Sequence, residues 1–452
     1  MISNRSNEID KEERPGDFTD DLSGVLKEAT CPACGHHIAV SFFNPGPQTL
    51  ATLAWPRTSE EAKTMVKLPH DFVRCVDCGH VYNCQFDYAV VPYCDKPNLM
   101  FNRGAVWSEH LQSVRDLILE ILPENPTVVE IGCGEGHLLR SLAQNHPAGN
   151  YIGFDPNAEV ETAGGLFHAR TELFDPAVHL QELKPDLIVS RHVFEHLVNP
   201  LGFVQKVAFA ASWVNLSTRL FLEVPCIDPV LENPRTVDFF YEHNSHFTTT
   251  SLRRMLQRCA SKVVMVETSF NREVVYGLAD FVPQPHQAKM ARDSIAFQKT
   301  TTAQHDSLAT QFEALLAHRK KIAIWGGTGK AAAFIQQNEL DAKRFPTVVD
   351  SDPAKAGTHV PGTGQPIRYR DVLKTEPAEI VVIATHWRSP DIVAEILAEE
   401  ISCEQILIEY RGKLVDYFTG DHPYRIEGTK RSKIARPHFL AIKETSHSRI
   451  DR

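Results

Sequence analysis

Short apolar runs rich in β-branched residues alternate with helical patterns through the middle of the chain. Residues 128–131 form one such run, a helical pattern follows over residues 137–143, and a second run covers residues 151–154. Further runs occupy residues 185–190 and 220–225. Runs of this length are typical of buried strands, and their alternation with helices is typical of a mostly parallel sheet. The pattern predicts an α/β fold.

A second group of apolar runs begins well after the first. Residues 321–325, 347–350 and 379–385 are each short and β-branched, and a helical pattern follows the first of them. We therefore expect a second, separate α/β unit. At 452 residues, the chain is long enough for about three domains.

Composition narrows the classes of function. The chain has 42% apolar and 23% charged residues, which is typical of a globular protein. Its net charge of −10 argues against a nucleic acid partner. The sequence has no long uncharged apolar stretch and no hydrophobic signal core near its start, so we expect a cytoplasmic protein without a membrane span.

Two Cys-x-x-Cys pairs, each followed by glycine, stand out among the ten cysteines. They are Cys31 with Cys34, and Cys75 with Cys78. Each pair forms a tight turn that presents two thiolates, and two such turns make a closed tetrahedral site that suits zinc. A closed site leaves no position for substrate, so the metal is expected to be structural. The alternatives are a redox pair or free thiols.

A glycine turn follows the first apolar run. Gly132, Gly134 and Gly136 let the backbone approach a bound nucleoside closely, and Glu130 at the strand end is placed to accept from a cationic amino group. Asp155, at the end of the next run, lies where a doubly wound fold offers a carboxylate to ribose hydroxyls. A plain strand-to-helix turn and a nicotinamide site are the alternatives. The set resembles the cofactor site of class I S-adenosylmethionine (SAM) methyltransferases.

Polar residues also follow the run at 185–190. Arg191 and His192 are expected on the cofactor side of this strand end, and His196, four residues after His192, on the substrate side. One of the two histidines is alternatively a structural residue.

Titratable and aromatic residues are dense between Asp238 and Thr248. Methyl transfer to carbon or oxygen needs a base to remove a proton, and histidine is the natural base near neutral pH. We expect His243 to be this base, oriented by Glu242, with Tyr241 in the same site. A helix cap is the alternative role, and it suits His246 better than His243.

Two further segments are candidates for substrate contact. Phe101 and Trp107 are expected in a flap over the substrate, with a packed linker as the alternative. In the second α/β unit, Gly327, Gly329 and Ala332, with Asp350 about twenty residues later, suggest NAD by motif alone. Reuse of the turn to hold substrate phosphates is the other possibility. Lys330 and Arg388 are candidates to bind phosphate, with exposed surface charge as the alternative.

The order of these motifs resembles the sugar C-methyltransferase family over about residues 29–412. The resemblance rests on the paired Cys-x-x-Cys turns, the SAM-binding core, Tyr241-Glu242-His243 and the second glycine turn. It implies a zinc module, a methyltransferase core, and a Rossmann-like domain without its own redox cofactor. The chain departs from the family pattern at residues 271–275 and 385–388, where the substrate is expected to bind.

The implied reaction is C-methylation of a nucleotide-linked 4-keto deoxysugar, with His243 and Glu242 as the family's base pair. The implied partner is a nucleotide sugar, and the expected assembly is a monomer or weak homodimer. O- or N-methylation of a metabolite and a non-catalytic SAM-binding or scaffold role are the alternatives. The expected divisions are a disordered acidic tail (1–28), a zinc module (29–97), a methyltransferase domain (98–290), a Rossmann-like substrate domain (291–412) and a tail (413–452).

Overall fold

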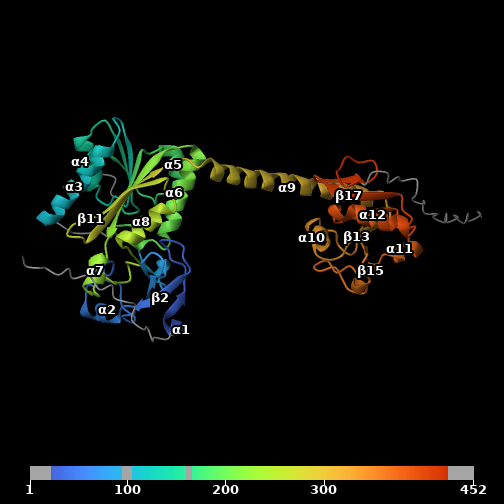
Figure 1. The fold of residues 1–452 in the computed structure, drawn as a ribbon, viewed down its shortest axis with the longest axis horizontal. Helices are drawn as coiled ribbons and strands as arrows, with labels where there is room; N and C mark the ends of the chain where they lie inside the picture. The colour runs from blue at the N-terminus through green and yellow to red at the C-terminus, as the bar shows by residue number, and fades with distance from the viewer. Residues whose placement is uncertain (1–21, 94–103, 159–164, 426–452) are drawn as a thin grey trace, which may run out of the picture. The chain divides into compact units, whose positions relative to one another are not determined.

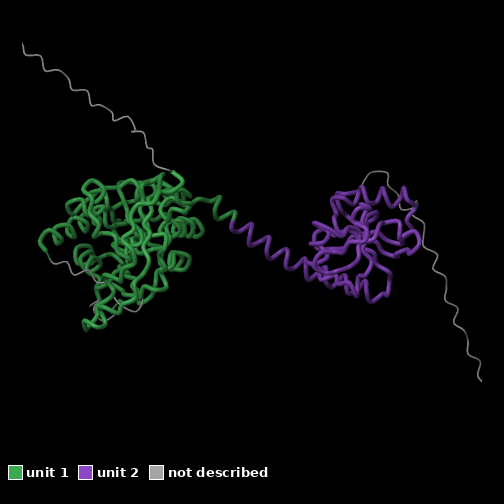
Figure 2. The backbone as a smooth tube through the Cα atoms, turned by 90° about the horizontal axis from the view of Figure 1, so that it is seen from below, with its two compact units in different colours: residues 1–290 green, residues 291–452 purple. Residues whose placement is uncertain are grey.

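The computed structural model describes residues 22–93, 104–158 and 165–425. The chain divides into two compact units, residues 1–290 and 291–452 (Figure 2). A long helix, α9 (Pro285–Ala317), begins in the first unit and ends in the second. The predicted α/β class and the second α/β unit are both confirmed. Phe101 lies outside the described residues.

The first unit contains a seven-stranded sheet in the order β11-β12-β9-β8-β5-β6-β7. The five strands from β9 to β7 are parallel, β12 runs antiparallel to β9, and β11 runs antiparallel to β12. In chain order the strands are β5 (Thr127–Ile131), β6 (Asn150–Phe154), β7 (His168–Arg170), β8 (Leu187–Arg191), β9 (Thr218–Pro225), β11 (Lys262–Ser269) and β12 (Val274–Phe281).

Helices cover both faces of this sheet (Figure 1). Successive strand residues point to opposite faces, so Val128 packs in one core cluster and Val129 in the other. The cluster around Val128 includes side chains of α3 and α4, and the cluster around Val129 includes side chains of α5, α6 and α8. The helices that cover the sheet are α3 (Ala105–Ile121), α4 (His137–Asn145), α5 (Pro176–Leu183), α6 (Pro200–Val214) and α8 (Thr249–Gln257). The unit also contains α7 (Asp228–Glu232), whose Val230 packs in a separate cluster, and a short 3₁₀ turn, η3 (Phe194–His196).

A smaller antiparallel sheet belongs to the same unit, in the order β1-β2-β3-β4-β10. Four strands come from the amino-terminal region, but β10 lies between the methyltransferase strands β9 and β11 in sequence. Its residues Ser245 and His246 pair with Tyr82 and Val81. The elements are α1 (Leu22–Val25), β1 (Leu26–Glu28), β2 (Ile38–Phe43), α2 (Ser59–Thr64), β3 (Phe72–Cys75), β4 (Val81–Asn83), η1 (Tyr88–Val90) and β10 (Ser245–His246).

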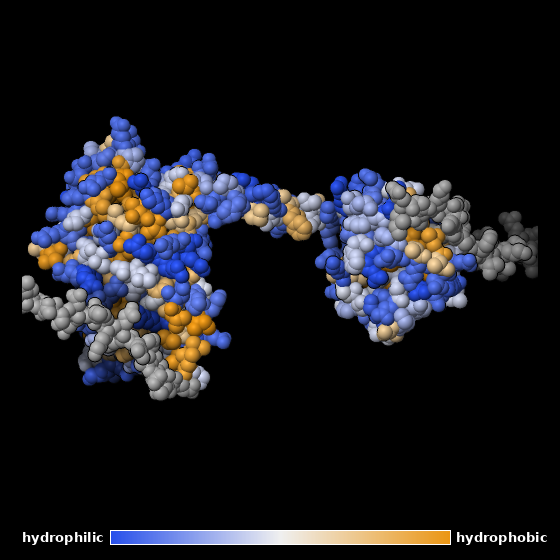
Figure 3. All heavy atoms as spheres, viewed as in Figure 1, coloured by the Kyte–Doolittle hydropathy of each residue, from blue (hydrophilic) through white to orange (hydrophobic). Residues whose placement is uncertain are grey.

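The first unit exposes apolar side chains at its amino-terminal corner. Leu22 is 62% exposed, and Val25 and Leu26 beside it are also exposed; Figure 3 shows apolar atoms on this corner.

No helix in the described ranges is both long and apolar enough to cross a membrane.

The second unit contains a six-stranded sheet in the order β15-β14-β13-β16-β17-β18. All neighbouring pairs are parallel except β17 and β18, which are antiparallel. Because β18 ends at Asp416, the sheet extends past residue 412, the expected end of this domain. The elements after α9 are β13 (Ile322–Trp325), α10 (Lys330–Gln337), β14 (Thr347–Asp350), η4 (Pro353–Lys355), β15 (Ile367–Tyr369), α11 (Val372–Thr375), β16 (Ile380–Ile383), η5 (His386–Arg388), α12 (Ser389–Ala398), β17 (Gln405–Tyr410) and β18 (Lys413–Asp416).

Helix α8 directly follows β10 and begins with a capping box. The Ser251 N–H donates to Thr248 Oγ1 at 3.0 Å, and the Thr248 N–H donates to Ser251 Oγ at 2.9 Å. We predict that Thr248→Ala lowers the free energy of unfolding by about 1–2 kcal/mol in urea denaturation, because it leaves helix-terminal N–H groups unsatisfied. Thr250→Ala, at an exposed position of the same turn, is the matched control. Equal losses in the two variants would show that the cap does not stabilise the helix.

Candidate active site

The glycine turn between β5 and α4 adopts a backbone that favours glycine. Gly132 has φ 71°, Gly134 has φ 50°, and Gly136 has φ 69°. A Cβ on Gly132 would lie 2.3 Å from Val193 Cγ2, and one on Gly136 would lie 2.1 Å from Phe167 Cζ. The turn therefore depends on glycine for both its conformation and its packing.

Two carboxylates border this turn, as predicted. Asp155 follows β6, and its Oδ2 accepts from the Gly134 N–H at 3.0 Å. Glu130, on β5, is 4% exposed, and its Oε2 has no hydrogen-bond partner among the described residues. Burial, with a smaller contribution from Glu223 and Asp155, raises the pKa of Glu130 to about 8 even though Arg191 opposes the shift. A buried carboxylate oxygen without a donor fits a cationic amino group, because such a partner favours the charged form of the carboxyl and satisfies that oxygen.

A fully buried carboxylate, Glu223 of β9, gathers the basic residues next to the turn. Its Oε1 accepts from Arg191 Nε at 2.9 Å and lies 3.2 Å from His192 Nε2. Its Oε2 lies 3.1 Å from His110 Nε2. Burial alone raises the pKa of Glu223, but Arg191 and the two histidines together hold it well below its usual range. Arg191 and His192 are thus fixed to the sheet at the edge of the predicted cofactor site.

His192 has the left-handed φ of 55° and a second acidic neighbour, with its Nδ1 3.5 Å from Glu195 Oε1. Burial lowers the pKa of His192, but its contacts with Glu195 and Glu223 outweigh burial and raise it to about 9. Trp107 of α3 is 9% exposed, with ring centroids 5.7 Å from His192 and 5.1 Å from Phe270. The structure therefore places Trp107 as a packed wall of this region, within the first turn of a helix.

The carboxylate of Glu242 is bound by backbone N–H groups of the amino-terminal region. Ala51, Thr52 and Leu53 donate to Glu242 Oε1 at 2.8, 2.7 and 3.0 Å, and Glu242 is 0% exposed. The carboxylate thus has partners other than His243, which we expected it to orient. The side chain of Tyr241 also binds a backbone amide of the amino-terminal region, because its hydroxyl accepts from the Asp87 N–H at 2.9 Å.

The carbonyl oxygen of Glu242 joins two further side chains. His196 Nδ1 lies 2.7 Å from it, and the Tyr93 hydroxyl donates to it at 2.5 Å. Tyr93 Oη also lies 2.9 Å from His196 Nδ1. The Glu242 backbone therefore fixes the imidazole of His196 through Nδ1, which leaves Nε2 as the nitrogen on the other side of the ring.

His243 lies against these groups. Its ring centroid is 4.9 Å from that of His196 and 4.2 Å from that of Phe240. Burial, followed by the neighbouring His196, His246 and His192, lowers the pKa of His243 well below its ordinary value. The imidazole is therefore neutral at pH 7 and has a lone pair available to accept a proton.

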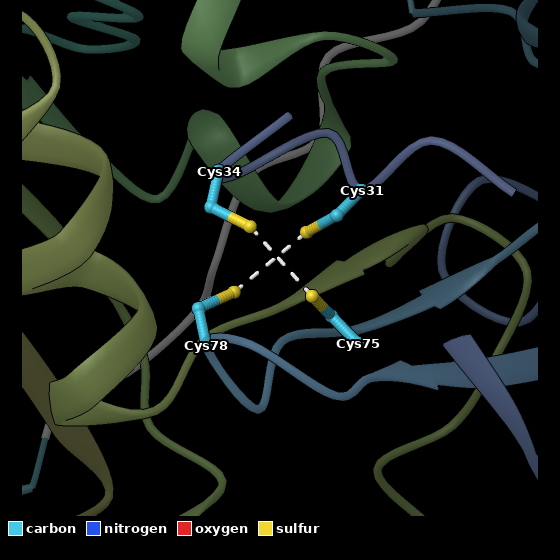
Figure 4. A group of neighbouring side chains, drawn as sticks. All are labelled: Cys31, Cys34, Cys75 and Cys78. Atoms are coloured by element: carbon cyan, nitrogen blue, oxygen red, sulfur yellow. Dashed lines mark hydrogen bonds between the residues drawn. The ribbon is translucent and has the colours of Figure 1, made fainter. Parts of the chain in front are cut away.

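The four predicted cysteines lie together (Figure 4). The Sγ atoms of Cys31 and Cys78 are 3.7 Å apart, and those of Cys34 and Cys75 are 3.6 Å apart. Around a tetrahedral zinc with Zn–S bonds of about 2.3 Å, neighbouring sulfurs lie about 3.8 Å apart. All four residues are buried, and the cluster therefore fits a closed zinc site.

The second unit brings its two predicted phosphate-binding residues to one edge of its sheet. Lys330 begins α10 after β13, and Arg388 ends η5 after β16, the strand that pairs with β13. Both are exposed, and Lys330 Nζ lies 5.4 Å from the ring centroid of Trp387. Asp350 accepts from Lys355 Nζ at 3.2 Å, so the acid that would contact a ribose already has a cationic partner.

Comparison with known proteins identifies two domains. Residues 106–264 match a family described as "Methyltransferase domain", and residues 263–408 match a "C-methyltransferase C-terminal domain". The chain is 32% identical over 106 residues to a ubiquinone biosynthesis O-methyltransferase from Hydrogenovibrio crunogenus, covering 21% of this chain and 43% of the relative. It is 38% identical over 63 residues to a tRNA (guanine-N(7)-)-methyltransferase from Mycoplasma capricolum, covering 14% and 28%. The chain thus spans less than half the length of these curated relatives.

A solved SAM-dependent methyltransferase from Aquifex aeolicus is similar to part of this chain, with 15% identity, a TM-score of 0.29, and coverage of 38% of this chain and 98% of the other. The family match gives residues 106–264 a methyltransferase domain, and the sheet, the glycine turn and its two carboxylates give this domain a class I methyltransferase core. More particularly, the chain combines this domain with a C-methyltransferase C-terminal domain and an amino-terminal four-cysteine cluster, which fits the architecture of the sugar C-methyltransferases.

Several residues of the site were not predicted from the sequence. Tyr93, Glu223 and His110 were absent from the candidates, as were the amides of residues 51–53. Glu223 interrupts the apolar run of residues 220–225, and a charged residue inside a buried strand is a signal that identifies it. The amides carry no signal, because every residue other than proline has one.

The glycine turn yields a test with a matched control. We predict that Gly132→Ala weakens SAM binding about tenfold or more in calorimetric titration, because the new methyl group pushes Val193 against the turn. Gly165→Ala is the control, since Gly165 also has a left-handed φ (78°) but a Cβ there meets nothing within 4 Å. It should cost about 1–2 kcal/mol of stability and leave binding intact. Equal binding in the two variants would contradict a cofactor role for the turn.

The raised pKa of His192 predicts a pH dependence of stability. Its stabilisation is complete below the unfolded-state pKa near 6.5 and is lost as pH rises through about 9, an effect of about 3 kcal/mol. The difference in unfolding free energy between the wild type and His192→Asn should therefore shrink as pH rises from 6.5 to 10. A difference that stays constant over this range, measured by urea denaturation, would contradict the ion pairs of His192.

Proposed function

We propose that this enzyme methylates a carbon atom next to the ketone of a nucleotide-linked 4-keto deoxysugar, with His243 as the base. The observation that carries the proposal is the neutral imidazole of His243 beside His196, in a chain with a C-methyltransferase C-terminal domain. A C–H bond next to a ketone is acidic enough for imidazole to remove its proton when the resulting enolate is stabilised.

In the proposed reaction, His243 accepts the proton from the carbon next to the ketone. The electron pair of the broken C–H bond forms the enolate, whose negative charge lies on the ketone oxygen. Bound SAM supplies an electrophilic methyl group, which the enolate carbon takes while the C–S bond pair stays on sulfur. The proton on His243 is then released to solvent.

The other groups of the site hold His243 in place. The three N–H donors on Glu242 tie the segment around His243 to residues 51–53, and the Glu242 carbonyl fixes His196 and Tyr93. We assign Glu242 and Tyr241 positioning roles. The ring centroid of His196 lies 4.9 Å from that of His243, which places His196 beside the base and near the proposed position of the substrate oxygens. Tyr93 contacts His196 Nδ1 and would position this imidazole.

The residues present suit SAM. Glu130 would accept from its amino group, Asp155 would accept from the ribose hydroxyls, and the turn from Gly132 to Gly136 would lie against the nucleoside. Asp155 Oδ2 now accepts from the Gly134 N–H, and the ribose hydroxyls would share or replace this donor. Arg191 and His192 form a positive edge of the site for the carboxylate of the methionine part.

The second unit is suited to the nucleotide part of the substrate. Lys330 and Arg388 lie after two adjacent parallel strands, β13 and β16, at the point where the strand order reverses. Ligands of open α/β sheets bind at this point, and two cations there suit a diphosphate. A structural zinc ion in the four-cysteine cluster would hold together the turn of Cys31 and Cys34, before β2, and the turn of Cys75 and Cys78, at the end of β3.

O-methylation is a second candidate, because a curated relative with 32% identity over 106 residues is an O-methyltransferase. The same base would then remove a hydroxyl proton. Transfer of a ¹³C-labelled methyl group separates the two reactions by product NMR, since C–CH₃ and O–CH₃ carbons resonate far apart.

We predict that His243→Asn slows turnover about 100-fold or more while SAM affinity stays within twofold, because the variant lacks the base but keeps the cofactor site. It should also lose the exchange of solvent deuterium into the 4-keto sugar in the absence of SAM. His286→Asn, at an exposed position of α9, is the control and should match the wild type in both assays. Undiminished deuterium exchange in His243→Asn would exclude His243 as the base.

A further inference from the structure

A group of three side chains beside the proposed base has the ligand set of a metal centre. Glu195, His196 and His243 each offer one ligand atom, and these atoms all lie within 4.8 Å of one another. Two imidazoles and one carboxylate form a common ligand set for divalent cations of the zinc and cobalt type, with open positions left for other ligands.

The carboxylate of Glu195 supplies a second, independent observation. Glu195 is 2% exposed, and its Oε1 faces His192 Nδ1 at 3.5 Å. Its Oε2 is buried and accepts no hydrogen bond from any residue that the structure describes. A buried carboxylate oxygen without a donor is costly unless a cation or a donor reaches it.

The histidines are arranged as metal ligands usually are. His196 Nδ1 lies 2.7 Å from the Glu242 carbonyl oxygen, so one of its two ring nitrogens has a backbone carbonyl as partner. Metal-bound histidines almost always donate their second nitrogen to a carbonyl or carboxylate in this way. The ring of His243 lies 4.9 Å from that of His196, at an interplanar angle of 67°, so the two rings approach edge to face.

The geometry needs only a small contraction to close around an ion. With metal–ligand bonds of about 2.1 Å, neighbouring ligand atoms of a tetrahedral sphere lie about 3.4 Å apart. The ligand atoms now lie within 4.8 Å of one another, so closure around an ion requires an approach of at most about 1.4 Å between any two of them.

We infer that Glu195, His196 and His243 bind one divalent cation of the zinc and cobalt type, and that this cation inhibits methyl transfer. Binding of the cation stands on the geometry alone. Inhibition rests on the proposed function, since His243 has one available lone pair and uses it either for the cation or for the substrate proton. The cation and the 4-keto sugar therefore compete for the site.

The test uses Co²⁺ on the full chain, with the four-cysteine cluster first filled with zinc and with no SAM or sugar present. We expect one equivalent of Co²⁺ per chain, with visible d–d bands and no sulfur-to-cobalt charge-transfer band, because the ligands are nitrogen and oxygen. Glu195→Gln and His243→Asn should each raise the Co²⁺ dissociation constant at least about tenfold. His137→Asn is the matched control, because His137 also pairs with a glutamate, Glu135, at 2.7 Å, yet belongs to neither group of possible metal ligands found among the described residues. It should leave the affinity unchanged.

Absence of the Co²⁺ equivalent, or its persistence in both variants, would overturn the cation site whatever the enzyme's substrate. Turnover with rising Co²⁺ is a separate readout, and it should fall competitively with the sugar and recover when a chelator is added. Activation by Co²⁺, or inhibition that is not competitive, would overturn the inhibitory role and leave the binding result standing.

Discussion

The proposed catalytic segment depends on one carboxylate bound by backbone amides. Glu242 is fully buried, and an unpaired charge there would be costly, so three N–H donors from residues 51–53 are needed to stabilise it. The same residue's carbonyl oxygen joins His196 and Tyr93. The amino-terminal region thus contributes to the proposed site, because its loop between β2 and α2 supplies the donors that fix the residues next to His243.

His192 and His243 lie in different electrostatic environments, which shift their pKa values in opposite directions. His192 lies between Glu195 and Glu223, and its raised pKa keeps it cationic at neutral pH. His243 is surrounded by other imidazoles and by apolar rings, and its lowered pKa keeps it neutral. Two imidazoles in one site therefore have opposite protonation states, which suits one to bind an anion and the other to accept a proton.

The sequence was sufficient to predict the features that depend on local pattern. The strands at 128–131 and 151–154, the glycine turn, and the gathering of four cysteines each follow from short-range rules, and the structure contains all of them. Pairing across long distances was not predictable. The two-residue strand β10 has no periodic signal, and Glu242 binds amides 191 residues earlier in a loop without a motif. The chemical roles of His243 and Glu242 therefore remain predictions, although the structure adds the contacts that refine them.

The pairing of β10 with β4 has a consequence for how the chain folds during synthesis. Strand β4 cannot pair with β10 until the ribosome has made Ser245 and His246. One edge of β4 therefore stays unpaired while the intervening residues are synthesised. An open strand edge invites association with other chains, so a nascent chain stalled before residue 245 would be prone to aggregation. Expression of the amino-terminal region by itself would leave the same edge unpaired, and a fragment that is to stay monomeric must therefore extend through β10.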